Sequence, residues 1–331
     1  MRFDFTEDQH EIKRTAKDFL ASRFTPEKQR ESAESGEYDA ELSQELTELG
    51  WPGVAISEQY GGGGLGYVEL ASLLEESGYA LLNGPFLSTV TCAAAITECG
   101  SSEQKEKWLG RLASGEATGA FGLTGEIIAD AEAADVLVVA DRDSGTARLI
   151  DDGQFPAVKT IDPSRRYARP EPDPVAGEAM SGDPGPALDL AAVLVSAELV
   201  GISQRALDMT LEYVKDRRQF GRPVGSFQAV QHRCAQMLLQ TEGARSASYF
   251  AAWAADADRQ RLPEAASLAK SSASKAGIDV TASAIQAHGG IGFTWEANVH
   301  WFYKRAQLDA AFLGGSSFHN QRLTRLVTPP V

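Results

Sequence analysis

Apolar residues recur at helical spacing through the first third of the chain. Thr6 and Gln9 form a Thr-x-x-Gln capping box, and apolar side chains then follow at intervals of three or four residues, which predicts a helix from about residue 7. Further helical stripes follow, one of them beginning after Asp39. We therefore expect residues 1–118 to form a helical N-terminal domain.

The pattern changes to a β-like one between residues 119 and 186. The runs 136–139 and 147–150 are rich in aliphatic residues, and the Asp-Arg-Asp-Ser-Gly segment between them is typical of a hairpin turn. Prolines crowd the stretch 163–186 and exclude a long helix there. We expect residues 119–186 to form a small, reduced β domain.

Helical periodicity returns in the last part of the chain, over residues 187–331. One stripe consists of Ile202, Ala206, Met209 and Tyr213. A Gly-Arg-Pro segment at 221–223 separates this helix from the next, and an Ala- and Ser-rich helix is expected over 265–287. These patterns predict a C-terminal bundle of long helices, and the whole chain is expected to be mainly α with a small β domain.

Composition limits the classes of function. The 331 residues are 43% hydrophobic and 23% charged, as in a folded protein with a large core. A net charge of -15 argues against nucleic-acid binding. The first residues lack the apolar segment of a signal peptide, and no window approaches a membrane span, so we expect a cytoplasmic protein. Cys92, Cys99 and Cys234 have no metal-site or disulfide spacing.

Two arginines precede a tight turn in the segment Arg217-Arg218-Gln219-Phe220-Gly221. A guanidinium group here could bind a diphosphate, with Phe220 as an apolar wall. The alternative is that the arginines complement the dipole at the C-terminus of the preceding helix. Spacing alone favours this alternative.

A glycine-rich turn follows the small-residue helix, in the segment Gln286-Ala287-His288-Gly289-Gly290-Ile291-Gly292. Backbone without a Cβ can approach a ligand closely. Most such turns are simple helix ends, so this segment by itself is weak evidence.

Together, the two segments resemble the FAD-contacting segments of the acyl-CoA dehydrogenase family. The first matches Arg-x-x-Phe-Gly followed by Phe-Gln, and the second supplies the Gln and the paired glycines. The resemblance implies contacts with FAD, across a dimer interface, from Arg217, Phe220, Gln228, Gln286, Gly289 and Gly290. It also implies the family fold: a helical N-terminal domain, a β middle domain, and a C-terminal four-helix bundle that forms the oligomer.

The catalytic base of that family is the main departure. Many members carry it in a Tyr-Glu-Gly-Thr segment, and alignment through 304–306 places Leu313 at that position, or Gly314 after a one-residue shift. Other members, such as isovaleryl-CoA dehydrogenase, carry the base where this chain has Ala191. None of these side chains can remove the α-proton of an acyl-CoA. Glu198 is the nearby acid that could act as a displaced base.

The middle region is a second departure from the family pattern. After Leu123-Thr124-Gly125-Glu126 the chain passes almost directly to the next strand, so segments that contact the flavin ring in the family are shortened. Thr124 remains as a candidate contact. A complete flavin site within this one chain is therefore not expected.

The resemblance implies a non-catalytic subunit of a heteromeric, α2β2 acyl-CoA dehydrogenase. A homologous partner would supply the Glu, the acyl-CoA pocket and the flavin-ring contacts, and an electron-transferring flavoprotein would accept the electrons. Paired subunits of this kind act on steroid side chains in bacteria, which suggests a bulky acyl-CoA. The alternatives are a homomeric dehydrogenase that uses Glu198, and a non-enzymatic scaffold that binds acyl-CoA or protein.

Overall fold

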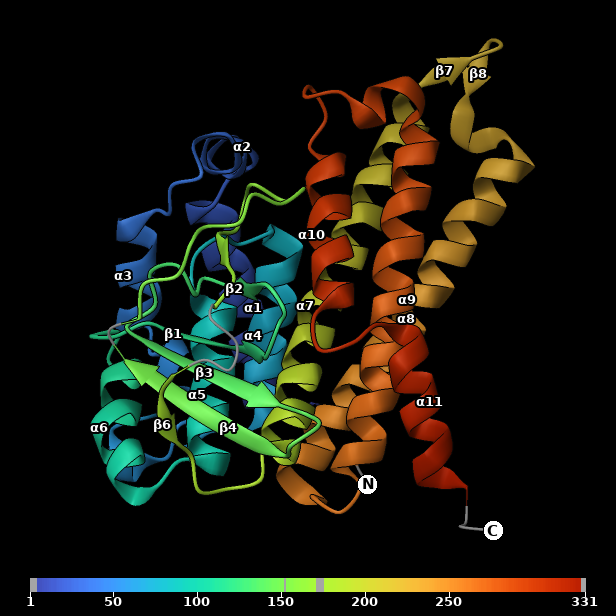
Figure 1. Ribbon diagram of the computed structural model, residues 1–331. Coiled ribbons are helices and arrows are strands. Elements are labelled where there is room, and N and C mark those ends of the chain that lie inside the picture. Colours follow the sequence, from blue (N-terminus) through green and yellow to red (C-terminus); the bar gives the residue numbers. More distant parts are fainter. Residues whose placement is uncertain (1–4, 152, 171–175, 329–331) are drawn as a thin grey trace.

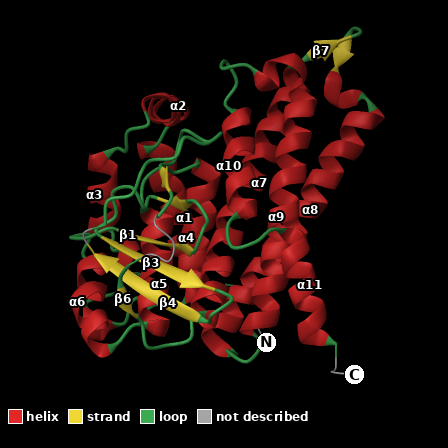
Figure 2. Ribbon diagram, in the orientation of Figure 1, coloured by secondary structure: helices red, strands yellow, loops and turns green. Residues whose placement is uncertain are grey.

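The computed structural model describes residues 5–151, 153–170 and 176–328 of the chain. Helices predominate; the strands between residues 119 and 179 lie beside the first group of helices, whereas the two short strands at 218–223 lie at one end of the long C-terminal helices (Figures 1 and 2). The predicted class, mainly α with a small β domain, is confirmed. Part of the proline-rich stretch, at 171–175, lies outside the described residues, as do residues 1–4, where no signal segment was expected.

Six helices of the N-terminal part come first: α1 Glu7–Arg23, α2 Pro26–Ser35, α3 Ala40–Glu48, α4 Tyr67–Ala80, α5 Phe86–Cys99 and α6 Ser102–Ala113. The capping box forms as predicted, because the Gln9 amide N donates to Thr6 Oγ1 at 3.2 Å and the Thr6 amide N donates to Gln9 Oε1 at 2.9 Å. The sequence pattern did not predict helix α2. Its sequence is polar all round, and its signals were the Thr25 cap and Pro26 in the first turn.

The β part consists of β1 Gly119–Leu123, β2 Ile128–Ala129, β3 Val136–Asp141, β4 Thr146–Asp151, β5 Tyr167–Ala168 and β6 Glu178–Ala179. One sheet has the order β1-β3-β4-β6, and β2 pairs with β5. The predicted hairpin is the antiparallel β3–β4 pair, whereas β1 runs parallel to β3. Helix α5 packs against β1 and β3, so the sheet shares a core with the N-terminal helices.

Among the described residues, the C-terminal part contains five α-helices: α7 Gly185–Asp216, α8 Gln228–Ala257, α9 Leu262–His288, α10 Val299–Ala311 and α11 Ser316–Val327. Helix α9 contacts the other four, and α7 to α10 form the predicted bundle with α11 as an addition. Short strands β7 Arg218–Gln219 and β8 Arg222–Pro223 follow α7, and the 3-10 helix η4 Gly289–Phe293 follows α9. Figure 1 shows these two connections at the same end of the bundle.

Helix α7 is the central helix of the molecule. It packs on α4 through glycines: a Cβ added at Gly201 would lie 1.8 Å from the Glu75 carbonyl O, and one at Gly78 would lie 2.1 Å from the Glu198 carbonyl O. By length and composition α7 is also apolar enough to cross a membrane, which corrects the expectation that no window approaches a span. Since its apolar window is mostly buried within the protein, it is a core helix.

Candidate functional site

The segment after α7 forms a projecting hairpin. The Arg217 amide N still donates to the Tyr213 carbonyl O at 2.9 Å, and β7 and β8 then pair around a turn made by Phe220 and Gly221. Both turn residues have positive φ, 53° and 76°, as a tight two-residue hairpin requires. The turn leaves the Phe220 side chain 92% exposed. An exposed phenylalanine in a conformation that favours glycine suggests a role outside the fold.

The segment after α9 leaves open backbone on the surface. Gly289 ends the helix with φ 67°, and a Cβ at Gly289 or Gly290 would meet no atom within 4 Å. Packing within the chain therefore does not require glycine at position 290. A ligand that lies close to the backbone would require it, because a Cβ would occupy the same space. The Gln286 side chain is exposed one turn earlier. The positions predicted to contact the ADP part of FAD are thus accessible.

A ring stack holds the two segments together. The Tyr213 ring, in the last turn of α7, lies 4.4 Å from the His288 ring at the end of α9. His288 is buried and its Nδ1 lies 2.7 Å from the Ala284 carbonyl O, which agrees with a packing role. Within the described residues neither Arg217 nor Arg218 forms a salt bridge, so both guanidinium groups can reach an anion. Guanidinium groups and open backbone are groups that can bind a diphosphate and a nucleoside, and the contacts with FAD remain a prediction.

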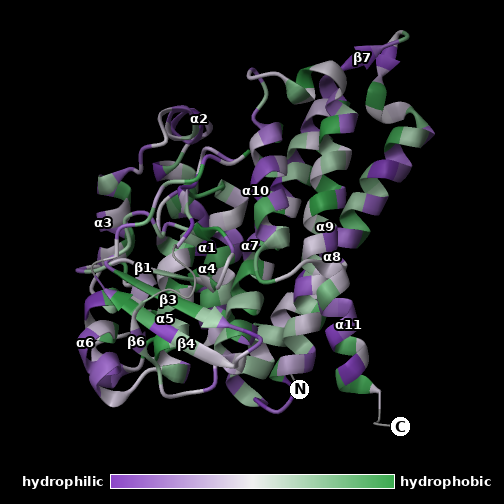
Figure 3. Cartoon of the chain, viewed as in Figure 1, coloured by the Kyte–Doolittle hydropathy of each residue, from purple (hydrophilic) through white to green (hydrophobic). Residues whose placement is uncertain are grey.

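The beginning of α8 extends away from the rest of the chain. Gln228 is exposed, and the helix has no buried residue until Met237. Large apolar side chains on or near this end are also exposed: Leu238, Leu239, Ile291, Phe293 and Trp295. Figure 3 shows hydrophobic residues on this outer stretch as well as on the packed helices. Several exposed apolar side chains on one end of a protein indicate a surface for association.

The positions that the sequence alignment above matches to the family's base hold buried apolar side chains. Leu313 and Ala191 are fully buried and belong to the same apolar cluster, together with Phe121 and Leu123. The two alternative positions therefore belong to one apolar cluster. Gly314 follows with φ 92° and contributes only backbone.

The loop that carries Leu313 is tightly held. Arg142 Nη2 donates to the Leu313 carbonyl O at 2.6 Å, and Lys270 Nζ donates to the carbonyl O atoms of Ala310 and Gly314 at 3.0 and 3.2 Å. Burial lowers the pKa of Lys270 to about 7 and that of His319 to about 3. Neutral His319 places Nε2 3.1 Å from the Leu313 carbonyl O, as a donor. These contacts offset the cost of a non-glycine residue at φ 58°.

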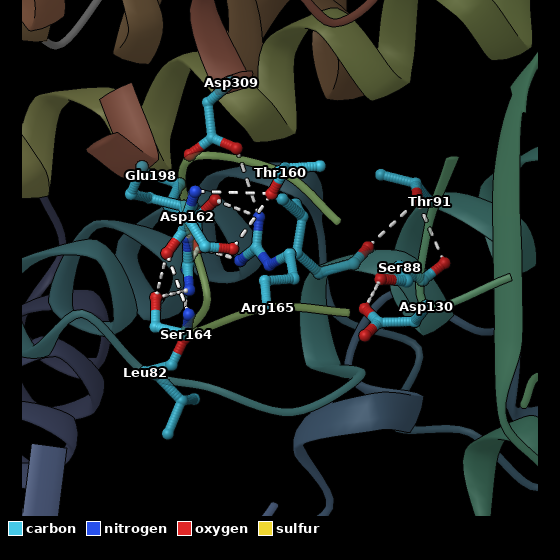
Figure 4. Close-up of polar contacts among 12 residues, drawn as sticks. Leu82, Ser88, Thr91, Asp130, Thr160, Asp162, Ser164, Arg165, Glu198 and Asp309 are labelled. Carbon is cyan, nitrogen blue, oxygen red and sulfur yellow. Dashed lines mark hydrogen bonds and ion pairs between the residues drawn. The ribbon is translucent and has the colours of Figure 1, made fainter. Parts of the chain in front are cut away.

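Glu198 lies in a buried ionic cluster (Figure 4). Arg165 donates from Nη2 to Glu198 Oε1 at 2.7 Å and from Nη1 to Oε2 at 3.2 Å. Burial opposes ionisation, but Arg165 and Arg305 together lower the pKa of Glu198. Both oxygens of Glu198 are thus occupied by Arg165. A displaced base needs a free oxygen and a raised pKa, so this geometry gives Glu198 a structural role.

Arg165 and Arg305 connect three segments of the chain in this cluster. Arg165 Nη1 also donates to Asp309 Oδ1 at 3.1 Å, and Arg305 Nε donates to Asp162 Oδ2 at 2.5 Å. Burial and the charge of Glu198 raise the pKa of Asp309 well above its usual range. With Asp309 protonated, two guanidinium groups balance the two carboxylates of Asp162 and Glu198. No motif in the sequence predicted this cluster.

The hydroxyl of Thr124, at the end of β1, forms a hydrogen bond within the protein. The Thr124 amide N and Oγ1 both donate to the Ala140 carbonyl O, at 3.0 and 3.4 Å. β2 is two residues long and begins four positions after Thr124.

Cys92 and Cys99 are buried, and burial raises the pKa of each thiol to about 12, whereas Cys234 is half-buried. The described residues contain no group of three or more His, Cys, Asp or Glu side chains placed to hold a metal.

Comparisons with known proteins cover nearly the whole chain. Residues 6–116 match the family "Acyl-CoA dehydrogenase, N-terminal domain" and residues 186–327 match "Acyl-CoA dehydrogenase, C-terminal domain". The acyl-CoA dehydrogenase IpdE2 of Mycobacterium tuberculosis is 37% identical over 279 residues, which cover 83% of each protein.

Solved structures share the fold. A chain of the ChsE4-ChsE5 complex from Mycobacterium tuberculosis superposes with a TM-score of 0.88 and 26% identity over 100% of both chains. A chain of the Tcur3481-Tcur3483 steroid ACAD, solved as a variant, gives a TM-score of 0.86 and 28% identity over 97% of this chain and 98% of that one. Both of these relatives are named as pairs of different polypeptides.

Proposed function

Because this chain belongs to the acyl-CoA dehydrogenase family, we propose that it is the non-catalytic subunit of a heteromeric member of that family. The observation that carries the proposal is the apolar filling of both base positions, Leu313 and Ala191. Desaturation of an acyl-CoA requires a group that removes the α-proton, and neither side chain can do so. The complex remains an oxidoreductase that acts on a CH-CH bond, with the base on the partner.

This subunit contributes the ADP side of the cofactor site. FAD, when bound, would supply the hydride acceptor for this desaturation. Arg217 binds the diphosphate by charge-assisted hydrogen bonds, and Phe220 packs on the cofactor as an apolar wall. Gln286 and the open backbone of Gly289 and Gly290 hold the adenosine part, and Gln228 lies at the adjoining start of α8. Their exposure in the single chain supports a role toward a cofactor held by another subunit.

A homologous catalytic chain is the partner that fits the exposed end of the bundle. The projecting start of α8 and exposed apolar side chains such as Phe293 and Trp295 form a surface that another polypeptide could bury. The two-polypeptide composition of ChsE4-ChsE5 and of Tcur3481-Tcur3483 supports the same arrangement, here as an α2β2 assembly. The partner supplies the Glu, the acyl-CoA pocket and the flavin-ring contacts.

The printed name of one of these relatives supports a proposal for the substrate. The Tcur3481-Tcur3483 protein is described as a steroid ACAD, which supports an acyl-CoA with a bulky, steroid-derived acyl part. An electron-transferring flavoprotein is the acceptor that suits this chemistry. We place the complex in the cytoplasm.

Co-expression with a homologous acyl-CoA dehydrogenase chain that carries the catalytic Glu, taken from the same organism, tests the proposal. The complex should co-purify with FAD, and Arg217→Ala should lower the flavin retained after gel filtration without dissociating the chains. Arg325→Ala, which changes an exposed arginine on α11, is the matched control and should retain the flavin. Equal flavin retention in both variants would remove Arg217 from the site. A stable complex without flavin would favour the scaffold alternative.

A further inference from the structure

A cavity of about 580 Å³ opens between α3, the connection from α4 to α5, and the connection from α6 to β1. Its lining is mostly apolar and includes Leu46, Phe86 and Leu112. Figure 1 shows α3 and α6 on the side of the molecule opposite the long helices α8 and α11. The cavity is therefore remote from the segments predicted to contact FAD.

This cavity is separate from a smaller one, of about 250 Å³, that lies between α5 and the end of α10. Leu87, Ser88 and Thr91 line the smaller cavity, whereas Phe86 and Thr89 line the larger one, and the two cavities share no lining residue. At helical spacing these two sets of residues lie on opposite faces of α5. The larger cavity is thus a site of its own.

Asn83 supplies a buried acceptor that no described residue uses. It lies in the connection between α4 and α5, is only 6% exposed, and lines the cavity. Its Nδ2 donates to the Glu37 carbonyl O at 3.3 Å, which fixes the orientation of the amide, and its Oδ1 has no donor among the described residues. A buried acceptor without a donor destabilises a fold. Asn83 Oδ1 is therefore available to a donor on a ligand.

The start of α5 supplies donors beside the same cavity. Pro85 occupies the cap position, and no side chain caps the first turn, whose amide N–H groups have no acceptor within the helix. The backbone here is open, because a Cβ at Gly84 would have only Ser43 Oγ within 4 Å, at 3.8 Å, apart from its chain neighbours. Since Pro85 and Phe86 line the cavity, an acceptor bound there would lie near these N–H groups.

The charges around the cavity disfavour an ionic ligand. None of the described residues that line it is Lys or Arg, so the phosphates of a CoA thioester would meet no cation in the lining. The lining carboxylate of Glu116 is exposed and lies 3.4 Å from Arg111 Nε. An ammonium group at Asn83 would be buried with only a neutral amide oxygen as its partner. A hydroxyl is an uncharged group that donates and accepts through one atom, and it matches Asn83 Oδ1 and the start of α5.

We propose that this cavity binds an uncharged, largely apolar alcohol, whose hydroxyl donates to Asn83 Oδ1 and accepts from an amide N–H in the first turn of α5. The apolar body of the ligand packs against Leu46, Phe86 and Leu112. Pockets for drug-sized molecules range from about 300 to 1,000 Å³, and the cavity lies within that range. The site lies within this chain and does not depend on the proposed role toward a partner's FAD.

Three probes of nearly the same shape test the chemistry on the purified full chain. They are 4-phenylcyclohexanol, 4-phenylcyclohexanone and the anion 4-phenylcyclohexanecarboxylate, each titrated by ligand-observed NMR. The alcohol should bind roughly fivefold more tightly than the ketone, because the ketone leaves Asn83 Oδ1 without a donor. The carboxylate should bind more weakly than either.

Matched variants locate the binding. Asn83→Leu should remove the preference for the alcohol over the ketone, whereas Asn320→Leu, at an exposed position of α11 outside the cavity, should keep it. Ala40→Trp places a ring at the cavity from the exposed start of α3 and should abolish binding of the alcohol, even if Asn83→Leu is poorly folded. Ala311→Trp, at an exposed position that lines the smaller cavity, is its control and should leave the alcohol bound.

Four results would overturn the proposal. The alcohol may fail to bind, the ketone may bind as tightly as the alcohol, or the carboxylate may bind most tightly. The fourth is loss of alcohol binding in Ala311→Trp but not in Ala40→Trp, which would assign the alcohol to the smaller cavity.

Discussion

The buried Glu198–Asp309 pair makes the stability of the protein depend on pH in a defined direction. The raised pKa of Asp309 means that the folded chain keeps one proton that the unfolded chain releases above pH 4. Above pH 4 the native state therefore binds more protons than the unfolded state. The contribution of Asp309 to the free energy of unfolding falls as the pH rises from 4 toward the raised pKa of Asp309. The slope for one proton is about 1.4 kcal/mol per pH unit.

Replacement of Asp309 by Asn removes this proton without removing the hydrogen bond. The amide of Asp309→Asn can take the place of the carboxyl proton toward Glu198, and position 309 then carries no charge at any pH. Other buried acids, such as Glu76 with a pKa raised to about 7 by burial, contribute equally to both proteins. The difference in unfolding free energy, wild type minus variant, should therefore fall by about 1.4 kcal/mol between pH 5 and pH 6.

Urea unfolding followed by circular dichroism at a series of pH values measures this difference. Thr210→Ala is the control, because it removes a buried hydroxyl on α7 that donates to the Ala206 carbonyl O at 2.7 Å and has no titrating group as its partner. Its loss of stability should be the same at each pH. Parallel curves for wild type and Asp309→Asn would refute the assignment of the extra proton to Asp309.

Two further predictions concern the packing of the core and the exposed hairpin. Gly201→Ala should lower the free energy of unfolding by about 1–3 kcal/mol, because its Cβ would collide with the Glu75 carbonyl O. Gly243→Ala on α8 is the control: its Cβ would meet no atom within 4 Å, so the free energy of unfolding should rise by up to about 1 kcal/mol. Thermal unfolding of the two variants measures the difference. Phe220→Ser should change the stability of the isolated chain by less than about 0.5 kcal/mol but reduce the FAD that the complex retains, measured by absorbance. A large loss of stability in Phe220→Ser would mean that the hairpin serves the fold.

The local elements of this fold could be predicted because their signals are local. Capping residues, helical stripes and the Asp-Arg-Asp-Ser-Gly turn identified the first helix and the β3–β4 hairpin. Helix α2 escaped because a helix without an apolar stripe resembles a loop. The segments predicted to contact FAD were identified from family motifs and remain a prediction, and the structure adds that Phe220 and Gly290 lie on the surface.

The ionic cluster and the cavity could not be predicted from the sequence. Arg165 lies in a proline-rich stretch without periodicity, and its partners Glu198 and Asp309 are 33 and 144 positions away. Charged side chains at that separation carry no pattern until the helices are packed. Glu198 was interpreted as a candidate base because its neighbours in sequence are apolar, and only the packed structure reveals its arginine.

Flavin content of the chain purified alone and together with its partner tests the central proposal most directly. Flavin absorbance and dye-coupled acyl-CoA oxidation would be measured on both samples at equal polypeptide concentration. We expect the chain alone to hold no stoichiometric FAD and to show no turnover, and the complex to be active with half as many flavins as chains. Stoichiometric FAD and turnover in the chain alone would contradict the proposal.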